Sequence, residues 1–142
     1  MGALEATKYR GLAARLNFLA THRGDLQYAA KECCKHMSKP RKGDWERIKR
    51  VGRYLRGKPR SVQLFPFEVA KKKITGFADW AGDKATLKST SGGTLFLGAS
   101  MIKSWSTSQS IVALSSGEAE LYAKLAAQTA GLISLAMDFG VK

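Results

Sequence analysis

Two segments of this sequence each carry a pair of acidic residues at the end or the start of a predicted element. Asp79 and Asp83 stand in the segment GFADWAGD, at the end of a predicted strand, and Glu118 and Glu120 stand in ALSSGEAEL, at the start of the last predicted helix. A carboxylate at a strand end that faces another on a neighbouring helix can hold Mg²⁺, a hard cation that prefers oxygen ligands. Metal-dependent chemistry is therefore to be sought in these two segments.

The two glutamates differ in their expected roles. Ser115 and Glu118 have the spacing of a capping box, in which Ser115 caps the first turn and the Glu118 carboxylate accepts a hydrogen bond from the N-cap backbone. Glu120 has no such local role, and beside Leu121 it can point toward a partner element. Spacing alone favours a simpler alternative for Glu120, an exposed acid at the positive end of the helix or one paired with Lys124.

Asp79 also has a simpler interpretation, as a turn residue at the start of DWAGD. Trp80 and Trp105 are expected to pack in or beside the core, and stacking on a nucleobase is the alternative use of either ring. The sequence does not select between packing and stacking.

The second part of the chain predicts the elements that would position these acids. Short β-rich runs follow Pro59, namely SVQLFPF, KKITGFAD, GGTLFLG and a stretch from Met101 to Leu114, with turn-rich segments such as STSGG between them. From Gly117 the apolar period becomes that of a helix, which ends at Gly140 as a C-cap. Its expected apolar stripe consists of Leu121, Leu125, Leu132, Ala136 and Phe139.

Two helices are predicted at the start of the chain. The first extends from about Tyr9 to Ala20, and the second begins near Asp25 as its N-cap and stops before Pro40. The residues expected to face inward are Leu12, Leu16 and Leu19 on the first helix and Leu26, Ala29, Ala30 and Cys33 on the second.

A third predicted helix is amphipathic and strongly basic. Asp44 is its expected cap, and Gly57 and Pro59 end it. Its apolar seam consists of Trp45, Ile48, Val51 and Leu55. Its cations are Arg47, Lys49, Arg50, Arg53 and Arg56. These cations are candidate contacts to a phosphate backbone, while the seam docks on a neighbouring helix.

The charge of the chain is concentrated in the same region. Residues 1–60 carry 16 Lys and Arg against 5 acids, a net +11, whereas residues 61–142 carry 8 against 6, a net +2. Such an excess favours a polyanion, and nucleic acid is the commonest one in the cell. A solvated face that keeps the protein soluble is an equally weighted alternative for a generic basic protein.

Other composition features exclude several classes of protein. No apolar run approaches the ~20 residues of a membrane span, and the N-terminus lacks the layout of a signal peptide. The adjacent Cys33 and Cys34 have the wrong spacing for a zinc half-site or a redox pair, so they are expected to be free thiols, one packed and one facing water. An intracellular location, in cytoplasm or nucleus, is expected.

These segments resemble a known family, the copia-type LTR retrotransposon polyprotein. The resemblance runs in order through KYRGLAARLNFLA, DLQYAAKE, DWERIKRVGRYLRG, GFADWAGD, KSTSGG and IKSWSTSQSIVALSSGEAEL, and so covers nearly the whole chain. It implies an α+β or α/β fold with a division near Arg60. Residues 1–60 would be a helical connection after a reverse transcriptase, and residues 61–142 would be a partial RNase H-like domain with a three-stranded antiparallel sheet and its first helix.

The resemblance also implies an activity and its residues. The family cleaves the RNA strand of an RNA–DNA hybrid with carboxylates that hold two Mg²⁺ ions, and Asp79 and Glu120 correspond to two of its catalytic and metal-binding acids. The family reads DADW where this chain reads ADW, so Asp79 corresponds to either of the two family acids. The chain ends at Lys142, before the strand expected to carry the next metal-binding aspartate.

Two functions are therefore expected from different classes. The first is a polyprotein fragment whose RNase H-like region acts on RNA–DNA hybrid in the parent protein and is inactive as this isolated chain. The second is a non-catalytic basic module that binds nucleic acid or serves a structural role in a larger assembly.

Overall fold

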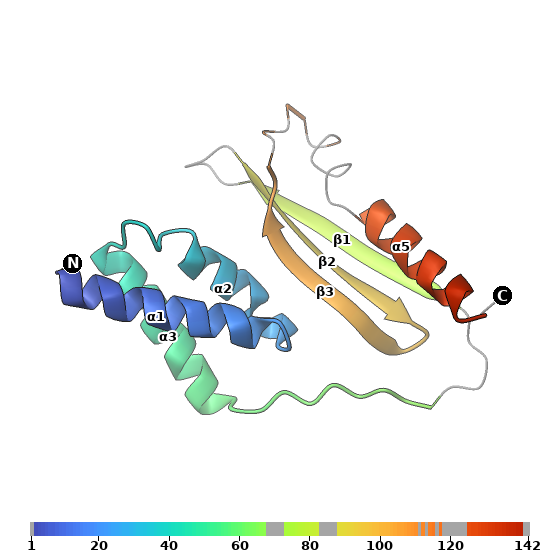
Figure 1. The fold of residues 1–142 in the computed structure, drawn as a ribbon, viewed down its shortest axis with the longest axis horizontal. Coiled ribbons are helices and arrows are strands. Elements are labelled where there is room, and N and C mark those ends of the chain that lie inside the picture. The colour runs from blue at the N-terminus through green and yellow to red at the C-terminus, as the bar shows by residue number, and fades with distance from the viewer. Residues whose placement is uncertain are drawn as a thin grey trace. The chain divides into compact units, whose positions relative to one another are not determined.

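The computed structural model describes residues 2–67, 73–82, 88–110, 112, 114, 115, 117 and 125–140. Two compact units make up the chain, Met1–Val62 and Gln63–Lys142. The described elements are helices in the first unit and a three-stranded antiparallel sheet with a further helix in the second (Figure 1). The predicted mixture of helices and an antiparallel sheet is confirmed. The RNase H-like assignment and the identity of the two predicted domains stay predictions.

The first unit is built from three helices around one core. Helix α1 spans Ala3–Ala20, a 3₁₀ turn spans Gly24–Leu26, α2 spans Gln27–Cys34 and α3 spans Lys42–Gly57. The core consists of Tyr9, Ala13, Leu16, Ala20, Leu26, Ala30, Cys33 and Ile48. Three helices that each bury one apolar stripe against the other two account for this cluster.

The stripe by which α1 enters the core differs from the predicted one. Leu16 is buried as expected, but Leu12 and Leu19 are 42% and 39% exposed, and the remaining α1 core residues are Tyr9, Ala13 and Ala20. The Tyr9 hydroxyl donates a hydrogen bond to the Cys33 carbonyl at 2.7 Å. That buried bond rotates α1 toward its Tyr9 side, since a buried hydroxyl needs a partner.

The first two helices also begin at other residues than predicted. Helix α1 begins at Ala3, where the Glu5 carboxylate accepts a hydrogen bond from the Gly2 N–H at 3.1 Å. Asp25 does not cap α2, because it lies inside the 3₁₀ turn and its carboxylate is bound to Arg23. Ala29 is half-buried, whereas Leu26, Ala30 and Cys33 are buried as expected.

Helix α3 keeps its predicted apolar pattern but begins at Lys42, two residues before Asp44, its expected N-cap. The Asp44 carboxylate accepts a hydrogen bond from the Arg41 N–H at 2.8 Å and so caps the helix from its third position. Ile48 is buried in the core, and Trp45, Val51 and Leu55 pack against that core while partly exposed. The predicted apolar seam of α3 is confirmed.

The two cysteines are free thiols, as expected. Cys33 is buried and Cys34 is half-buried. Burial raises the pKa of both thiols, which keeps them protonated near neutral pH.

A buried arginine joins the 3₁₀ turn to the end of α3. The Arg23 guanidinium donates to both oxygens of Asp25 at 2.9 and 2.7 Å, and to the carbonyls of Lys58 and Pro59 at 3.3 Å each. The Tyr54 hydroxyl donates to Asp25 Oδ2 at 2.7 Å. The hydrogen bond from Arg23 is the main reason that the pKa of Asp25 lies well below its ordinary value.

The second unit contains a sheet of three consecutive strands. Strand β1 spans Ile74–Gly82, β2 spans Ser89–Leu97 and β3 spans Ser100–Ser108, paired antiparallel in the order β1-β2-β3. Gly98, with φ 59°, supplies the left-handed residue in the short turn between β2 and β3. Helix α5 spans Leu125–Asp138 and is followed by Gly140, whose φ of 74° confirms the predicted C-cap.

One predicted strand is wrong. The run SVQLFPF, residues 61–67, has no strand in the structure, and Phe65 and Phe67 are exposed. Pro66 lacks the N–H that a paired strand position would donate. The other β-rich runs correspond to β1, β2 and β3, although β3 ends at Ser108 and does not continue to Leu114.

A tryptophan lies over a glycine at the centre of the sheet. Gly93 pairs with Ala78 on one side and Trp105 on the other. A Cβ placed at Gly93 would lie 2.3 Å from the Trp105 ring. The second glycine of KSTSGG is therefore required by the packing of Trp105, and the packing interpretation of Trp105 is confirmed.

We predict that Asp25→Asn lowers the free energy of unfolding by about 2 kcal/mol. This is below the roughly 3–5 kcal/mol of a fully buried pair because the Asp25 side chain is 25% exposed. Tyr54→Phe should cost about 1 kcal/mol, since it removes one hydrogen bond to a carboxylate. Chemical denaturation followed by circular dichroism measures both changes, and Asp138→Asn, at an exposed acid of α5, is the control for charge.

We further predict that the stabilisation from Asp25 depends on pH. Because its pKa is depressed on folding, the stabilisation is complete above the ordinary value of 3.8 and is lost as pH falls through the lower, folded value. The stability difference between the native protein and Asp25→Asn should therefore shrink as the pH of the denaturation series falls below about 4. A difference that stays constant down to the acid limit would contradict this account of Asp25.

We predict that Gly93→Ala destabilises the sheet by about 1–3 kcal/mol, because the added methyl group overlaps the Trp105 ring. Gly92→Ala is the matched control, since its Cβ meets only the Trp105 carbonyl oxygen at 3.8 Å. Thermal unfolding of both variants measures the difference. Equal losses for the two substitutions would show that Trp105 is not what excludes a side chain at Gly93.

Candidate nucleic-acid interface and predicted metal ligands

The predicted cations of α3 lie on its exposed side. The residues Arg47, Lys49, Arg50, Arg53 and Arg56 are all exposed. The apolar seam occupies the opposite side of the helix, where Ile48 enters the core. A helix whose seam is packed holds its remaining side chains toward solvent, so these cations form one accessible basic face.

Two of the five cations are already paired within the helix. Arg47 Nη1 lies 3.2 Å from Asp44 Oδ1, and Lys49 Nζ lies 2.9 Å from Glu46 Oε1. The hydrogen bond from Lys49 lowers the pKa of Glu46. Within the described part of the chain, Arg50, Arg53 and Arg56 have no ion pair, so their charges are the ones available to a polyanion.

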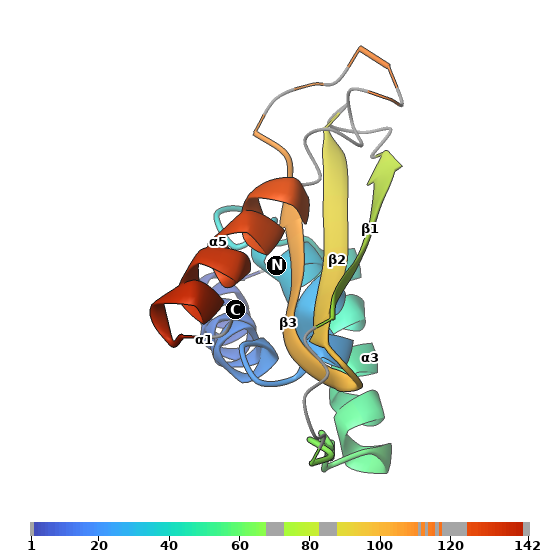
Figure 2. The same cartoon turned by 90° about the vertical axis from the view of Figure 1, so that its right-hand side faces the viewer.

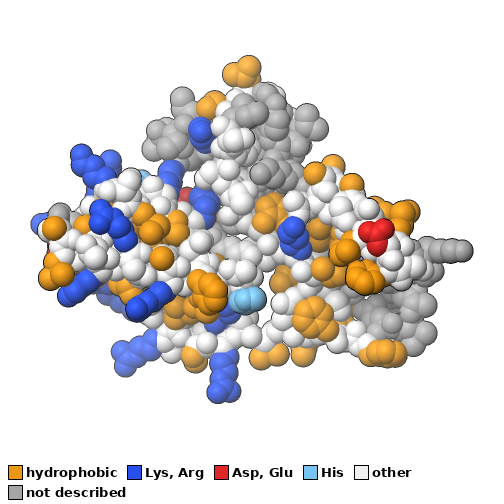
Figure 3. Space-filling view, viewed as in Figure 1, with side chains coloured by type: hydrophobic (Ala, Val, Ile, Leu, Met, Phe, Trp, Pro, Cys, Tyr) orange, Lys and Arg blue, Asp and Glu red, His pale blue; other side chains and the backbone are white. Residues whose placement is uncertain are grey.

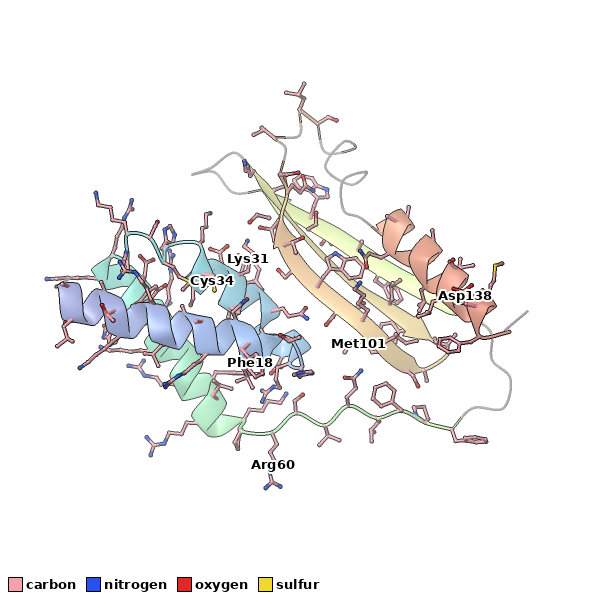
Figure 4. The ribbon with its side chains drawn as sticks, in the orientation of Figure 1. Phe18, Lys31, Cys34, Arg60, Met101 and Asp138 are labelled. Atoms are coloured by element: carbon pink, nitrogen blue, oxygen red, sulfur yellow. The ribbon has the colours of Figure 1, made fainter. Side chains whose placement is uncertain are left out.

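Further exposed cations extend this surface, and the sequence reasoning did not assign them. Lys42 opens α3 seven residues before Lys49 and therefore lies on the same side of the helix. Arg60 follows α3, and its side chain extends away from the ribbon (Figure 4). Helix α3 begins at Lys42, two residues before the expected cap Asp44, and this earlier start brings Lys42 into the helix. Figure 3 shows Lys and Arg side chains spread widely over the surface of the first unit.

Asp79 is exposed in the middle of β1. Its backbone pairs with Gly92 of β2, and Gly92 pairs with Ser106 of β3. The Asp79 Oδ1 atom accepts a hydrogen bond from the Trp80 N–H at 2.7 Å. Asp79 therefore lies inside a strand, and neither in a turn nor at the predicted strand end.

The register of the sheet determines which face carries Asp79. Leu95 and Lys103 are paired, and they line a cavity of about 410 Å³ together with α5, whose Gln128 accepts a hydrogen bond from Lys103. Helix α5 therefore covers the Leu95 face of the sheet (Figure 2). Side chains alternate between faces along a strand, and by this parity Gly93 and Ala78 share the face of Leu95. Asp79, next to Ala78, lies on the opposite face.

Three predicted site residues lie outside the described residues, namely Asp83, Glu118 and Glu120. The convergence of Asp79 with Glu120 and the capping box of Ser115 with Glu118 therefore stay predictions. Within the described ranges, no three His, Cys, Asp or Glu residues gather closely enough to hold a metal ion. These residues by themselves do not fit a magnesium centre, because Asp79 supplies one carboxylate and faces away from α5.

None of the described helices combines the length and the hydrophobicity that a membrane span requires.

Comparison with known proteins gives three informative relatives. The chain is 34% identical over 141 residues to the Retrovirus-related Pol polyprotein from transposon RE2 of Arabidopsis thaliana, which covers 97% of the chain and 10% of that protein. It is 35% identical over 131 residues to the Uncharacterized mitochondrial protein AtMg00810 of the same plant, across 90% of the chain and 53% of that protein.

A third relative comes from another organism. The chain is 34% identical over 117 residues to the Secreted RxLR effector protein 161 of Plasmopara viticola, across 79% of the chain and 80% of that protein. No family model and no solved structure matches the chain. The chain thus spans about a tenth of the polyprotein that it matches over nearly all of its own length.

Proposed function

Since the chain belongs to the copia-type retrotransposon Pol polyproteins, of which it represents a segment, we propose that residues 61–142 are the first part of an RNase H-like domain. In the complete polyprotein this domain would cleave the RNA strand of an RNA–DNA hybrid. Such a role would place it inside the cell, in cytoplasm or nucleus. The 142-residue chain by itself would not carry out the cleavage.

The observation that carries this proposal is the order of elements in the second unit. An antiparallel β1-β2-β3 sheet is followed along the chain by α5, which covers one face of the sheet. This is the arrangement that the resemblance predicts for the start of an RNase H-like domain. The alignment to the RE2 polyprotein over 97% of the chain supports the same assignment.

The proposed chemistry of the parent domain depends on Mg²⁺. Two ions held by carboxylates would activate a water molecule and stabilise the oxygen that leaves phosphorus. Asp79 and Glu120 are the proposed ligands from this segment. One exposed carboxylate in β1 is too few for either ion, because Mg²⁺ requires near-octahedral oxygen coordination held by several groups.

We therefore predict that the isolated chain does not cleave a labelled RNA–DNA hybrid in the presence of Mg²⁺. Cleavage is followed on a denaturing gel, with an active ribonuclease H as the positive control and Asp79→Asn as the matched variant. Both forms of the chain should remain at the level of the buffer. Robust turnover that Glu120→Gln abolishes would overturn the proposed inactivity and would place Glu120 in a working metal site.

A second function is favoured by the basic face of α3. Arg50, Arg53 and Arg56 are exposed and have no ion pair in the described part of the chain, within a region of net charge +11. We propose that this face contacts the phosphates of RNA–DNA hybrid or of another nucleic acid. It would do so whether or not the second unit is catalytic, and it would serve equally in a larger protein assembly.

We predict that Arg53→Gln combined with Arg56→Gln weakens binding to a duplex and lowers the slope of log affinity against log salt concentration by roughly 2. Fluorescence anisotropy over a salt series measures the slope. Lys73→Gln with Lys88→Gln removes the same charge from exposed positions of the second unit and should leave the slope nearly unchanged. Equal losses in both double variants would indicate attraction by net charge and no specific role for α3.

A further inference from the structure

A groove that the described chain leaves open runs between α1 and α3, inside the first unit. It encloses about 350 Å³, and an adjoining hollow of about 330 Å³ shares Leu12, Arg15 and Trp45 with it. The two together extend along α1 from Lys8 to Leu19, which at 1.5 Å per residue is roughly 17 Å or three helical turns. This length suits a helix of a binding partner.

The floor of the groove is apolar. Leu16 and Ile48 form its base and belong to the core, while Trp45, Val51 and Leu55 form the wall on α3. On the α1 side, Leu12 and Leu19 line the groove while 42% and 39% exposed.

The exposed leucines of α1 are part of a regular pattern. Leu12, Leu16 and Leu19 have the spacing of a buried stripe, yet only Leu16 is covered within the first unit. The helix thus carries a second apolar stripe beside the Tyr9 stripe, and in the described structure this second stripe faces the groove. Apolar side chains repeated on one face of a helix indicate a surface that packs against another element.

The charges around the groove select the kind of partner. Among the described residues, the charged ones that line it are Lys8, Arg15 and Lys49, and none of its lining is acidic. Lys49 is paired with Glu46, whereas in the described part of the chain Lys8 and Arg15 have no ion pair. A second copy of this chain would bring a region of charge +11 against another of the same charge. An acidic partner complements the groove.

Two glycines leave room for close approach. Gly11 lines the hollow and Gly52 lines the groove, and a Cβ built at either meets no atom within 4 Å. Helix backbones come closest where such small residues face each other. An apolar floor, a basic rim and glycines open to solvent together match the side of an amphipathic helix.

We infer that the α1–α3 groove binds an amphipathic helix of a protein partner, with leucine-like residues at i, i+3 or i+4 and i+7 in the groove and acidic residues toward Lys8 and Arg15. This inference does not depend on the RNase H-like assignment, because every residue in it belongs to the first unit. It also differs from the basic face of α3, with which the groove shares only Lys49.

The test uses the full chain and a synthetic peptide of about 15 residues with leucines at that spacing and glutamates elsewhere. A peptide of identical composition with its leucines out of register is the control for charge. Fluorescence anisotropy should show the first peptide bound at least tenfold more tightly than the second. Equal affinity for the two would mean that charge alone attracts the peptide and would overturn the inference.

Gly52→Met places a long side chain in the groove and should not destabilise the fold. It replaces a helix-interior glycine by a better helix former, and no atom of the chain lies where its Cβ would be. Gly43→Met is the matched control, because Gly43 is also in α3 with open space around it but does not line the groove. Gly52→Met should weaken peptide binding at least tenfold, Gly43→Met should leave it unchanged, and both should keep the native melting temperature or raise it.

Other occupants give different results. If Gly52→Met weakens binding of a duplex as much as binding of the peptide, the groove belongs to nucleic acid. If the native chain dimerises in sedimentation and Gly52→Met is monomeric, it belongs to a second copy. Either result overturns the assignment to an acidic helix, and neither bears on whether the chain cleaves a hybrid.

Discussion

The hydrogen bond from the Tyr9 hydroxyl to the Cys33 carbonyl determines how the first unit is arranged. The ring of Tyr9 is fully buried, packs against α2, and lies with its centroid 6.5 Å from that of Trp45 on α3. Burial raises the pKa of the Tyr9 hydroxyl, so it is protonated and can donate near neutral pH. One residue therefore fixes α1 against both other helices, and the rotation of α1 decides which of its side chains are left for other contacts.

The rotation has a direct consequence for function. With Tyr9, Ala13 and Ala20 directed to the core, Leu12 and Leu19 are left exposed and line the groove beside the α3 seam. The same seam holds the cations of α3 on the far side. The first unit thus has two surfaces that share Lys49, an apolar groove with a basic rim and a basic helix face. Both follow from the position of α3 against the core.

Sequence patterns predicted the parts that local chemistry decides. In α3 the seam and the exposed cations follow from residues within a few positions of one another, so Ile48 lies as expected, whereas Asp44 caps the helix from its third position and is not the N-cap. The stripe of α1 could not be predicted in this way, because Leu12 and Tyr9 are equally plausible core residues until the Cys33 carbonyl on another helix supplies a partner. The run SVQLFPF has strand composition, but a strand requires a neighbouring backbone, and Pro66 cannot donate to one. For the predicted metal site, Asp79 could be placed at a strand, whereas its face required the pairing of three strands.

The pairing of β1, β2 and β3 also bears on the difference between ADW in this chain and DADW in the family that it resembles. The two family acids are two positions apart, and side chains two positions apart on a strand lie on the same face. Whichever acid Asp79 corresponds to, the unbroken register from Ile74 to Gly82 directs it to the face opposite Leu95 and α5. The two possible correspondences of Asp79 therefore differ only by two residues along β1, which is roughly 7 Å. A metal site that includes Asp79 must be completed on the face of the sheet opposite α5 or at the edge of the sheet, and the cover that α5 gives to the other face contributes nothing to it.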